Sequence, residues 1–405
     1  MARQTAGDTA PDASPPDLTT VLREWGRIGC LGFGGPPAHI VLFRALCVDR
    51  RRWLTAEDFE DAIATTNLLP GPGSTQMAIF CGWRTAGVPG AIVGGLAFIV
   101  PGLVLIIALA ALFLSAAPPA WVRGAGAGAG AAVAAVAVQA GGTLLTPGWA
   151  RVRDAGAARA RWVLYLLAGG AAAALAGPWT VVVLLGCGAA ELALAGAPGV
   201  RPGGGSAGPR LHAWPVLPAV FAAATAGGGL AALAWVAFKV GALSYGGGFV
   251  IIPLMQADAV GHHHWLTGAQ FTSGVALGQV TPGPVVHTVA VVGYAARGVA
   301  GALLAAAVAF APSFAFILIG GARFDRLRAD PRVRRFLAGA GPAAIGAILG
   351  SAVPLALALA EWWQAAVLAA AAVALFALRR GVVSTLVLAG VTGAAVGLAG
   401  GPLPV

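Results

Sequence analysis

Apolar segments long enough to cross a bilayer recur along the whole chain, separated by short polar, glycine-rich or proline-containing stretches. A helix that crosses the hydrocarbon core needs roughly 17–25 mostly apolar residues, so this pattern predicts an all-α integral membrane protein. The apolar segments are 25–45, 62–83, 88–114, 124–146, 162–177 and 179–197, then 228–255, 271–293, 298–321, 336–360, 363–378 and 382–403.

The second group of segments repeats the first in sequence. The motifs that begin at Gly29 and Pro70 return at Gly241 and Pro282, and 241 − 29 and 282 − 70 both give 212. Later glycines recur at an offset of 211, since Gly87 matches Gly298. Membrane proteins with two such halves are commonly transporters whose site lies where the halves meet. We expect a disordered tail at 1–19, a first repeat at 20–197, a Gly/Pro/Arg linker at 198–213 and a second repeat at 214–405.

Arginine placement predicts that the two halves enter the membrane upside down relative to one another. Loops 44–61, 147–161 and 321–335 are rich in arginine, whereas their repeat mates 256–272, 358–363 and 115–123 hold one arginine between them, Arg123. Cytoplasmic loops carry the excess of positive charge, so equivalent loops should lie on opposite sides.

An inverted pair requires an odd number of crossings in each half. Segments 62–83 and 271–293 are each broken by a Pro-Gly-Pro sequence, so we predict that they are re-entrant or discontinuous. This leaves about five spans per half. The apolar stretch 214–227 has no counterpart in the first half, and an additional crossing there would break the parity.

Composition agrees with a membrane protein and excludes several other classes. The chain has 405 residues, 58% hydrophobic and 10% charged, against roughly 25% charged in soluble domains. Its net charge of +10 is scattered between apolar segments, which argues against a nucleic-acid surface. The four cysteines show no metal-binding spacing, and no nucleotide-binding loop or hydrolase motif is present. We therefore expect no cofactor, no metal site and no enzymatic activity.

The paired Pro-Gly-Pro sequences predict an anion site. Proline ends the incoming helix, and we expect the second proline, Pro72 or Pro284, to occupy the first position of a new helix. The new helix directs free N–H groups and a positive dipole end toward the break. Gly71, Ser74 and Thr75 in the first half, and Gly283 and His287 in the second, are therefore candidate binding residues. The alternative is a packing kink.

Three further matched features lie near these breaks. Paired glycines, Gly34-Gly35 and Gly246-Gly247, interrupt the first segment of each half and allow a tight turn or close approach to a ligand. Arg27 and Lys239 are matched cations that either bind an oxyanion or extend to the headgroups. Asn67 and Gln279 are matched amides that donate to an anion or cap the broken helix.

Weaker signals have simpler interpretations. Glu191 lies alone in an apolar segment and is a candidate for carrying a coupling proton, although its repeat partner is missing. His262-His263-His264 is interpreted as a solvated polar turn in preference to a metal site. The glycine run 124–130 is expected to pack helices closely.

These motifs resemble the chromate ion transporter family. Each half carries a Phe/Tyr-Gly-Gly element, a Trp-Leu-Thr loop and an Asn/Gln-x-x-Pro-Gly-Pro element, the first set at Phe33, Trp53 and Asn67 and the second at Tyr245, Trp265 and Gln279. The similarity spans about 20–146 and 232–355 and implies a proton-linked exporter of chromate that confers chromate resistance from the cell's inner membrane. The doubled proline at Pro37 and the histidine triplet depart from the family pattern.

The leading hypothesis is that the protein is a secondary active transporter of a tetrahedral oxyanion. The resemblance implies that it is an antiporter. Chromate is the first candidate and sulfate the second, because a hydrogen-bonded site discriminates poorly between anions of the same charge and shape. The partners expected are chromate or sulfate, protons as the coupling ion and the lipid bilayer, with no nucleic acid; a homodimer is left open. The alternatives are an anion channel or a lipid-translocating protein of the same architecture.

Overall fold

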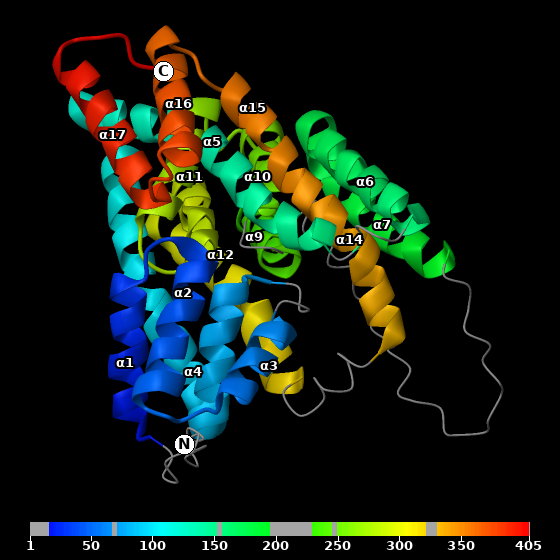
Figure 1. Ribbon diagram of the computed structural model, residues 1–405. Helices are drawn as coiled ribbons and strands as arrows, with labels where there is room; N and C mark the ends of the chain where they lie inside the picture. Colours follow the sequence, from blue (N-terminus) through cyan, green and yellow to red (C-terminus); the bar gives the residue numbers. More distant parts are fainter. Residues whose placement is uncertain are drawn as a thin grey trace, which may run out of the picture.

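The computed structural model describes residues 16–66, 71–150, 152, 156–194, 229–244, 249–320 and 330–404. Across these residues the protein is all-α, with no β-strand, which confirms the predicted fold class. Helices of both halves stand side by side in one elongated body, with helix α1 at one end and helix α17 at the other (Figure 1).

The chain begins with a broken helical pair. Helix α1 (Leu18–Leu31) starts one residue after Asp17, whose carboxylate accepts a hydrogen bond from the Thr20 backbone N–H. The chain reverses at Gly34 and Gly35, with φ of 99° and 73°. These are left-handed values that glycine adopts without a steric penalty. Helix α2 (Gly35–Arg44) then leads into the π-helical turn η1 (Ala45–Arg50).

A second broken pair follows. Helix α3 (Ala56–Thr66) is capped by Thr55, whose hydroxyl oxygen accepts from the Asp58 N–H at 3.0 Å. Helix α4 (Gly73–Phe113) turns sharply at Gly87, where φ is 63° and ψ is −156°. A Cβ placed on Gly82 would lie 2.4 Å from the Gly90 carbonyl oxygen, so the arms on either side of the turn touch backbone to backbone. We call residues 88–113 the long arm of α4.

The second half repeats this design. Helix α9 (Leu230–Leu243) precedes α10 (Ile251–Gln256) and the π-helical turn η4 (Ala257–His262). Helix α11 (Gly268–Val280) is followed by the 3₁₀ turn η5 (Val285–His287) and α12 (Thr288–Gly320). Helix α12 turns at Gly298 with φ of 61° and ψ of −151°, matching Gly87. We call residues 299–320 the long arm of α12.

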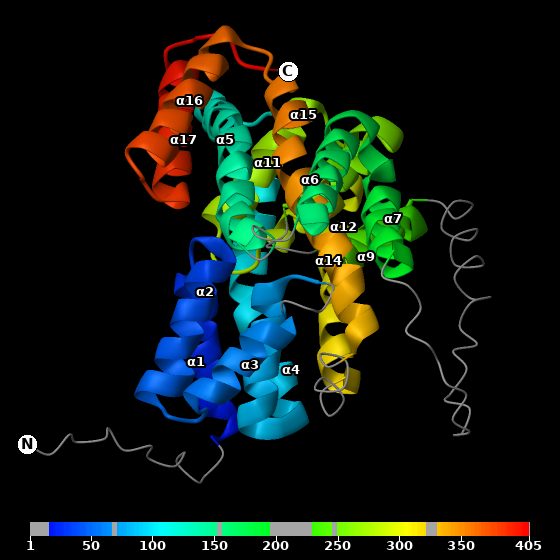
Figure 2. The same cartoon turned by 45° about the vertical axis from the view of Figure 1, so that its right-hand side comes forward.

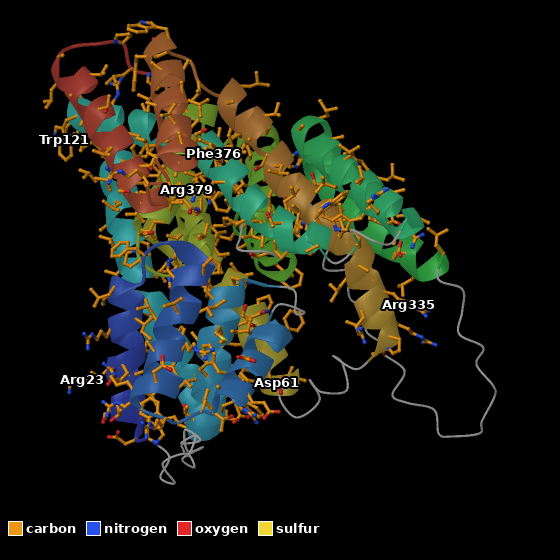
Figure 3. The ribbon with its side chains drawn as sticks, viewed as in Figure 1. Arg23, Asp61, Trp121, Arg335, Phe376 and Arg379 are labelled. Carbon is orange, nitrogen blue, oxygen red and sulfur yellow. The ribbon has the colours of Figure 1, made fainter. Side chains whose placement is uncertain are left out.

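The two long arms run in opposite directions. The long arm of α4 rises from the end of the molecule that holds α1, whereas the long arm of α12 descends to that end (Figures 1 and 2). Arg23, Asp61 and Arg335 lie toward that end, and Trp121 lies toward the other (Figure 3). Insertion of the two halves upside down relative to one another, and their orientation in a bilayer, stay predictions.

The remaining helices complete each half. In the first, α5 (Ala120–Ala150) is followed by α6 (Gly156–Ala171), the short turns η2 (Ala172–Ala176) and η3 (Gly177–Trp179), and α7 (Thr180–Leu194). In the second, α14 (Pro331–Gly350) and α15 (Ala352–Leu357) precede α16 (Trp362–Ala372), η7 (Val373–Ala377) and α17 (Val382–Leu398).

The last helices of each half pack on the other half. Glycines of α5 face α17, and a Cβ on Gly124 would lie 2.1 Å from the Gly393 carbonyl oxygen. In the second half, a Cβ on Gly346 of α14 would lie 1.8 Å from the Leu166 carbonyl oxygen of α6. Helix α14 also packs on α7 (Figure 2). The glycine run 124–130 therefore packs helices as expected, and the two halves are interlocked.

Length and hydropathy identify the helices able to cross a membrane. Within the described residues, four are long and apolar enough, Gly73–Phe113, Ala120–Ala150, Val285–Gly320 and Pro331–Leu357. Four shorter apolar helices accompany them, Thr180–Leu194, Leu230–Leu243, Trp362–Ala377 and Val382–Leu398. The chain is thus a multi-pass membrane protein. About five crossings per half stays a prediction. Residues 1–15 of the predicted tail, the whole predicted linker 198–213 and the apolar stretch 214–227 lie outside the described residues.

Candidate functional site

The two Pro-Gly-Pro breaks meet the glycine breaks of the opposite half. The backbone N–H of Gly71 donates to the carbonyl oxygen of Ser244 at 2.7 Å, and that of Gly283 donates to the carbonyl oxygen of Gly32 at 2.9 Å. Gly71 and Gly283 are repeat mates, as are Gly32 and Ser244. The two hydrogen bonds therefore form a pseudo-symmetric pair that joins the halves at their breaks. We call this region the central junction.

Backbone geometry explains why the breaks have this composition. Gly71 has φ of 132° and Gly283 has φ of 91°, values that side-chain-bearing residues rarely adopt. Pro72 and Pro284 are extended N-cap residues with ψ of 106° and 134°. The expectation that they open the new helix was wrong by one position. Helix α4 starts at Gly73, and the second-half helix starts with the 3₁₀ turn η5, because an extended ψ at the proline delays the first helical residue.

Each break also packs on the long arm of the other half. A Cβ built on Gly71 would lie 3.2 Å from Ser313 Oγ on α12. A Cβ on Gly102 of α4 would lie 2.1 Å from the Pro282 carbonyl oxygen and 2.7 Å from the His287 ring. Gly102 and Ser313 are repeat mates at the offset of 211. Only a residue without a side chain fits at Gly102, so the break of the second half lies directly against α4.

Buried hydrogen-bonding side chains without a protein partner gather on these elements. They are Thr75 Oγ1, Ser244 Oγ, Gln279 Nε2, Ser313 Oγ, His39 Nδ1 and both ring nitrogens of His287. Leaving one such group buried and unsatisfied costs about 1–3 kcal/mol, and native structures contain few of them. A set contributed by both halves at one junction is the arrangement expected of a binding site for a polar ligand.

Both buried histidines of this junction lie near the contact between Gly283 and Gly32. His39, on α2, places Nε2 2.9 Å from the Gly32 carbonyl oxygen, the same oxygen that accepts from Gly283. The His39 ring meets Phe98 edge-on at 5.0 Å, and the His287 ring meets Phe310 edge-on at 5.4 Å. Both histidine side chains are 0% exposed.

The predicted cations occupy different environments. Arg27 lies on the exposed face of α1, as expected of a side chain that extends to the headgroups. Lys239 Nζ lies 2.6 Å from Asp258 Oδ2, and the Asp258 side chain is 10% exposed. Asp258 was not predicted as a partner of Lys239, because the predicted apolar segment ended at residue 255. The sequence signal for Asp258 was an acidic residue three positions after the end of that segment.

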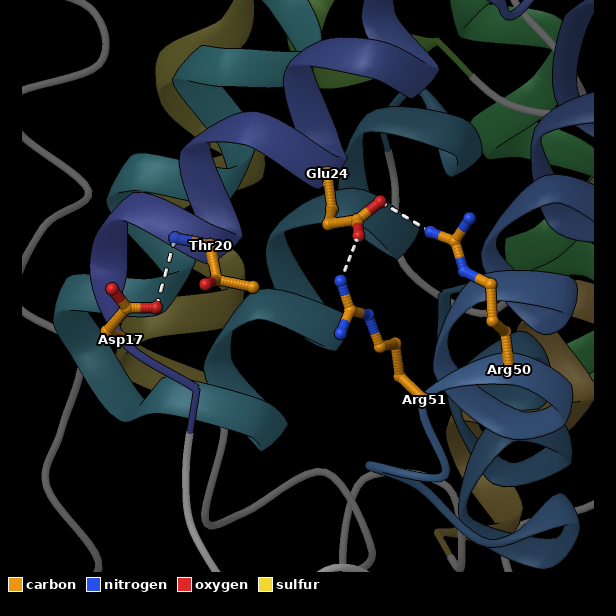
Figure 4. A network of polar contacts seen from close by, with 5 residues as sticks. All are labelled: Asp17, Thr20, Glu24, Arg50 and Arg51. Atoms are coloured by element: carbon orange, nitrogen blue, oxygen red, sulfur yellow. Dashed lines mark hydrogen bonds and ion pairs between the residues drawn. The ribbon is translucent and has the colours of Figure 1, made fainter.

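A reversed pair occupies the equivalent place in the first half. There the acid lies on the first helix, and Glu24 of α1 binds Arg50, the last residue of η1, and Arg51, which follows it, with Arg51 Nη2 2.6 Å from Glu24 Oε1 (Figure 4). In the second half the base, Lys239, lies on α9 and the acid on η4. Each ion pair fastens the first helix of its half to the π-helical turn of the same half.

The other candidate residues are placed as follows. Ser74 is buried in the first turn of α4, and Gly34 and Gly35 form the turn between α1 and α2. Asn67, Gly246 and Gly247 lie outside the described residues.

The weaker candidates have local explanations. Glu191 accepts hydrogen bonds from Arg161 at 2.9 and 3.0 Å and from Tyr165 at 3.0 Å. In the histidine triplet His262 and His264 are exposed, and His263 stacks on Trp265 at 4.3 Å. Burial holds the pKa of His263 below its usual value. Among the described residues, no group of three or more histidine, cysteine or acidic side chains could hold a metal ion.

The fold and the central junction define a multi-pass membrane protein made of two repeats whose broken helices meet at buried polar groups. The chain belongs to the chromate transporter family, which matches it over residues 19–192 and 231–398.

Relatives from several bacteria are similar over most of their length. The chain is 30% identical over 371 residues to a chromate transport protein of Cupriavidus metallidurans, covering 87% of this chain and 86% of the relative. It is 30% identical over 368 residues to a chromate transport protein of Pseudomonas aeruginosa, covering 88% and 86%. A probable chromate transport protein of Synechococcus elongatus is 28% identical over 332 residues, covering 81% and 82%. No solved structure matches the chain.

Proposed function

We propose that this protein is a secondary active transporter that moves chromate across the cytoplasmic membrane and holds the oxyanion at the central junction. The observation that carries the proposal is the pair of hydrogen bonds from Gly71 to Ser244 and from Gly283 to Gly32, which bring both breaks to one place. The family membership and the relatives named as chromate transport proteins support chromate as the substrate.

The chemistry of the junction suits an oxyanion. Thr75, Ser244 and Ser313 carry hydroxyls, Gln279 carries an amide, and His287 carries an imidazole that donates from at least one nitrogen. None of the groups in this set is a carboxylate. The start of α4 adds backbone N–H groups and the positive end of a helix dipole. A cation or an apolar solute would leave these donors unsatisfied.

The connectivity of the junction supports alternating access. Each break is bonded to the other half, so a rocking of one half against the other changes both contacts at once. We propose that this movement exposes the junction to one side of the membrane at a time. Export from the cytoplasm, linkage to protons and a role in chromate resistance are the finer parts of the proposal.

Chromate flux into inside-out vesicles tests it. We expect saturable chromate uptake that falls when an uncoupler collapses the proton-motive force and when sulfate is in excess. Thr75→Val and Ser313→Ala should each reduce uptake at least severalfold, since each removes a buried donor. Ser384→Ala is the matched control, because Ser384 is exposed on α17. Sulfate uptake without chromate uptake would remove the chromate assignment and the resistance role. Absence of both fluxes would contradict the oxyanion proposal.

A further inference from the structure

The central junction lacks a fixed positive charge of its own. Among the described residues no lysine or arginine is buried, while Glu24 and Asp258 are. The two cations that the sequence placed near the breaks are accounted for elsewhere, since Arg27 is exposed and Lys239 binds Asp258 at 2.6 Å. A dianion taken out of water requires a countercharge or a dense set of donors, because isolated buried charge is costly.

His287 lies where such a countercharge is needed. Its side chain is 0% exposed, neither ring nitrogen meets the geometry of a full hydrogen bond, and the Ile99 carbonyl of α4 is the backbone acceptor that bears on the ring. It ends the η5 turn that follows Gly283, and its ring packs against the position of Gly102 on α4. Its repeat mate is Thr75, another buried donor without a partner, so the two repeats present these two side chains at equivalent positions of the junction.

We infer that His287 is the protonatable countercharge of the anion site, so that the oxyanion and one proton bind together. The inference rests on the proposed function, because it concerns the same site. With the site empty, a charge on the buried ring has no counter-ion among the described residues. An oxyanion beside the ring favours the imidazolium, which then donates from both nitrogens. Since each ligand stabilises the bound form of the other, the linkage is reciprocal.

Few other described titratable groups near His287 could take up a proton when the oxyanion binds. The ring is packed by the long arm of α4 at Gly102, by the long arm of α12 at Phe310 and by the break at Gly283. The other described titratable side chain at this junction is His39 on α2. His39 already contacts the Gly32 carbonyl oxygen through Nε2, so one of its nitrogens is engaged.

Binding of one proton with the oxyanion also determines the electrical driving force for transport. A site loaded with a dianion and one proton carries one net negative charge, and both ligands move in the same direction. Export is then favoured by an inside-negative membrane potential, because one net negative charge leaves the cell with each anion. This differs from the proton exchange that an antiporter would perform.

Chromate binding to the purified full-length protein, measured across mildly acidic to mildly alkaline pH, tests the inference. Chromate itself takes up a proton in this range, so the comparison is between wild type and His287→Gln, which keeps a hydrogen-bonding side chain but cannot become charged. We expect the affinity of wild type to fall with rising pH more steeply than that of the variant, by about tenfold per pH unit where the histidine titrates. His264→Gln, an exposed loop variant, should behave as wild type.

Each outcome decides one point. A pH slope in His287→Gln equal to that of wild type would overturn the inference and leave the proposed function intact. If the variant fails to fold or to bind, proton uptake by wild type on adding chromate, recorded with an indicator in weak buffer, decides instead. Proton uptake larger than that of chromate without protein supports the inference. The absence of such additional proton uptake overturns it. Absence of chromate binding to wild type at every pH would contradict the proposed function itself.

Discussion

The backbone N–H of Gly71 donates to the carbonyl oxygen of Ser244, a residue of the other half of the chain, over 2.7 Å. Its repeat mate Gly283 does the same to Gly32 over 2.9 Å. The two halves are therefore joined at two pseudo-symmetric contacts. Any relative movement of the halves must strain or break these contacts, and in the proposed mechanism the junction is where movement and binding are coupled.

Substitution of the junction glycines tests this arrangement. We expect Gly71→Ala to abolish most chromate flux and to lower stability by about 1–3 kcal/mol, because φ of 132° is unfavourable for alanine and the new Cβ would lie 2.4 Å from Gln76 Nε2. Gly73→Ala is the matched control, two residues away, since its added methyl meets nothing within 4 Å. Thermal unfolding and vesicle flux measure the two effects. Equal behaviour of both variants would contradict the proposed role of the Gly71 turn.

Variants of the Lys239–Asp258 pair test whether Lys239 is a structural cation or a cation that binds the anion. Lys239→Met leaves the Asp258 carboxylate, 10% exposed, without its partner, and we expect a loss of about 3 kcal/mol in the free energy of unfolding. The double variant Lys239→Met/Asp258→Leu should recover most of that stability together with chromate flux. Recovered stability without recovered flux would instead show that Lys239 contributes to anion binding.

Close packing of α5 on α17 predicts a large response to side-chain size. Gly124→Leu should prevent folding or lower the melting temperature by many degrees, because its Cβ alone would lie 2.1 Å from the Gly393 carbonyl oxygen. Gly142→Leu on the same helix should be tolerated, since that position is exposed and its Cβ meets nothing within 4 Å. Size-exclusion profiles and thermal unfolding in detergent compare the two variants. Similar profiles would show that α5 does not depend on this contact.

Glu191 is expected to be dispensable for proton coupling. Arg161 and Tyr165 occupy its carboxylate oxygens in the structure, so it serves to join α6 to α7. Glu191→Gln should keep the dependence of chromate flux on the proton gradient and cost about 1 kcal/mol of stability at most, because the pair is partly exposed. A flux that no longer responds to the gradient would assign the coupling proton to Glu191.

Local rules predicted the breaks, and the structure shows why. Gly35, Gly71 and Gly283 have positive φ, and a glycine beside a proline signals such a turn from sequence alone. The fixed offset of the repeat then paired the breaks of the two halves. It also paired Gly87 with Gly298, but the turns at these glycines were not predicted. The prolines were displaced by one position, which local propensity does not resolve.

The residues that the breaks contact could not be predicted from the sequence, because these contacts are tertiary and join distant segments. Ser313 matches Gly102 in the repeat, so no pair of polar residues marked it. The sequence did mark Ser244, since it is a polar residue in an apolar segment, two residues before the glycine break of the second half. Its packing on Gly71, and the pairing of Lys239 with Asp258, join segments that no local pattern connects.

The packing of each half's last helices on the other half bears on how the protein is made. Helices α6 and α7 emerge from the ribosome well before α14, the helix of the second half on which they pack. During synthesis they must wait in the lipid with glycines such as Gly169 and Gly170 uncovered. Membrane insertion can proceed segment by segment, but assembly cannot finish until most of the second half has been translated. A chain interrupted in α14 should therefore be a substrate for quality-control proteases, although its first half is complete.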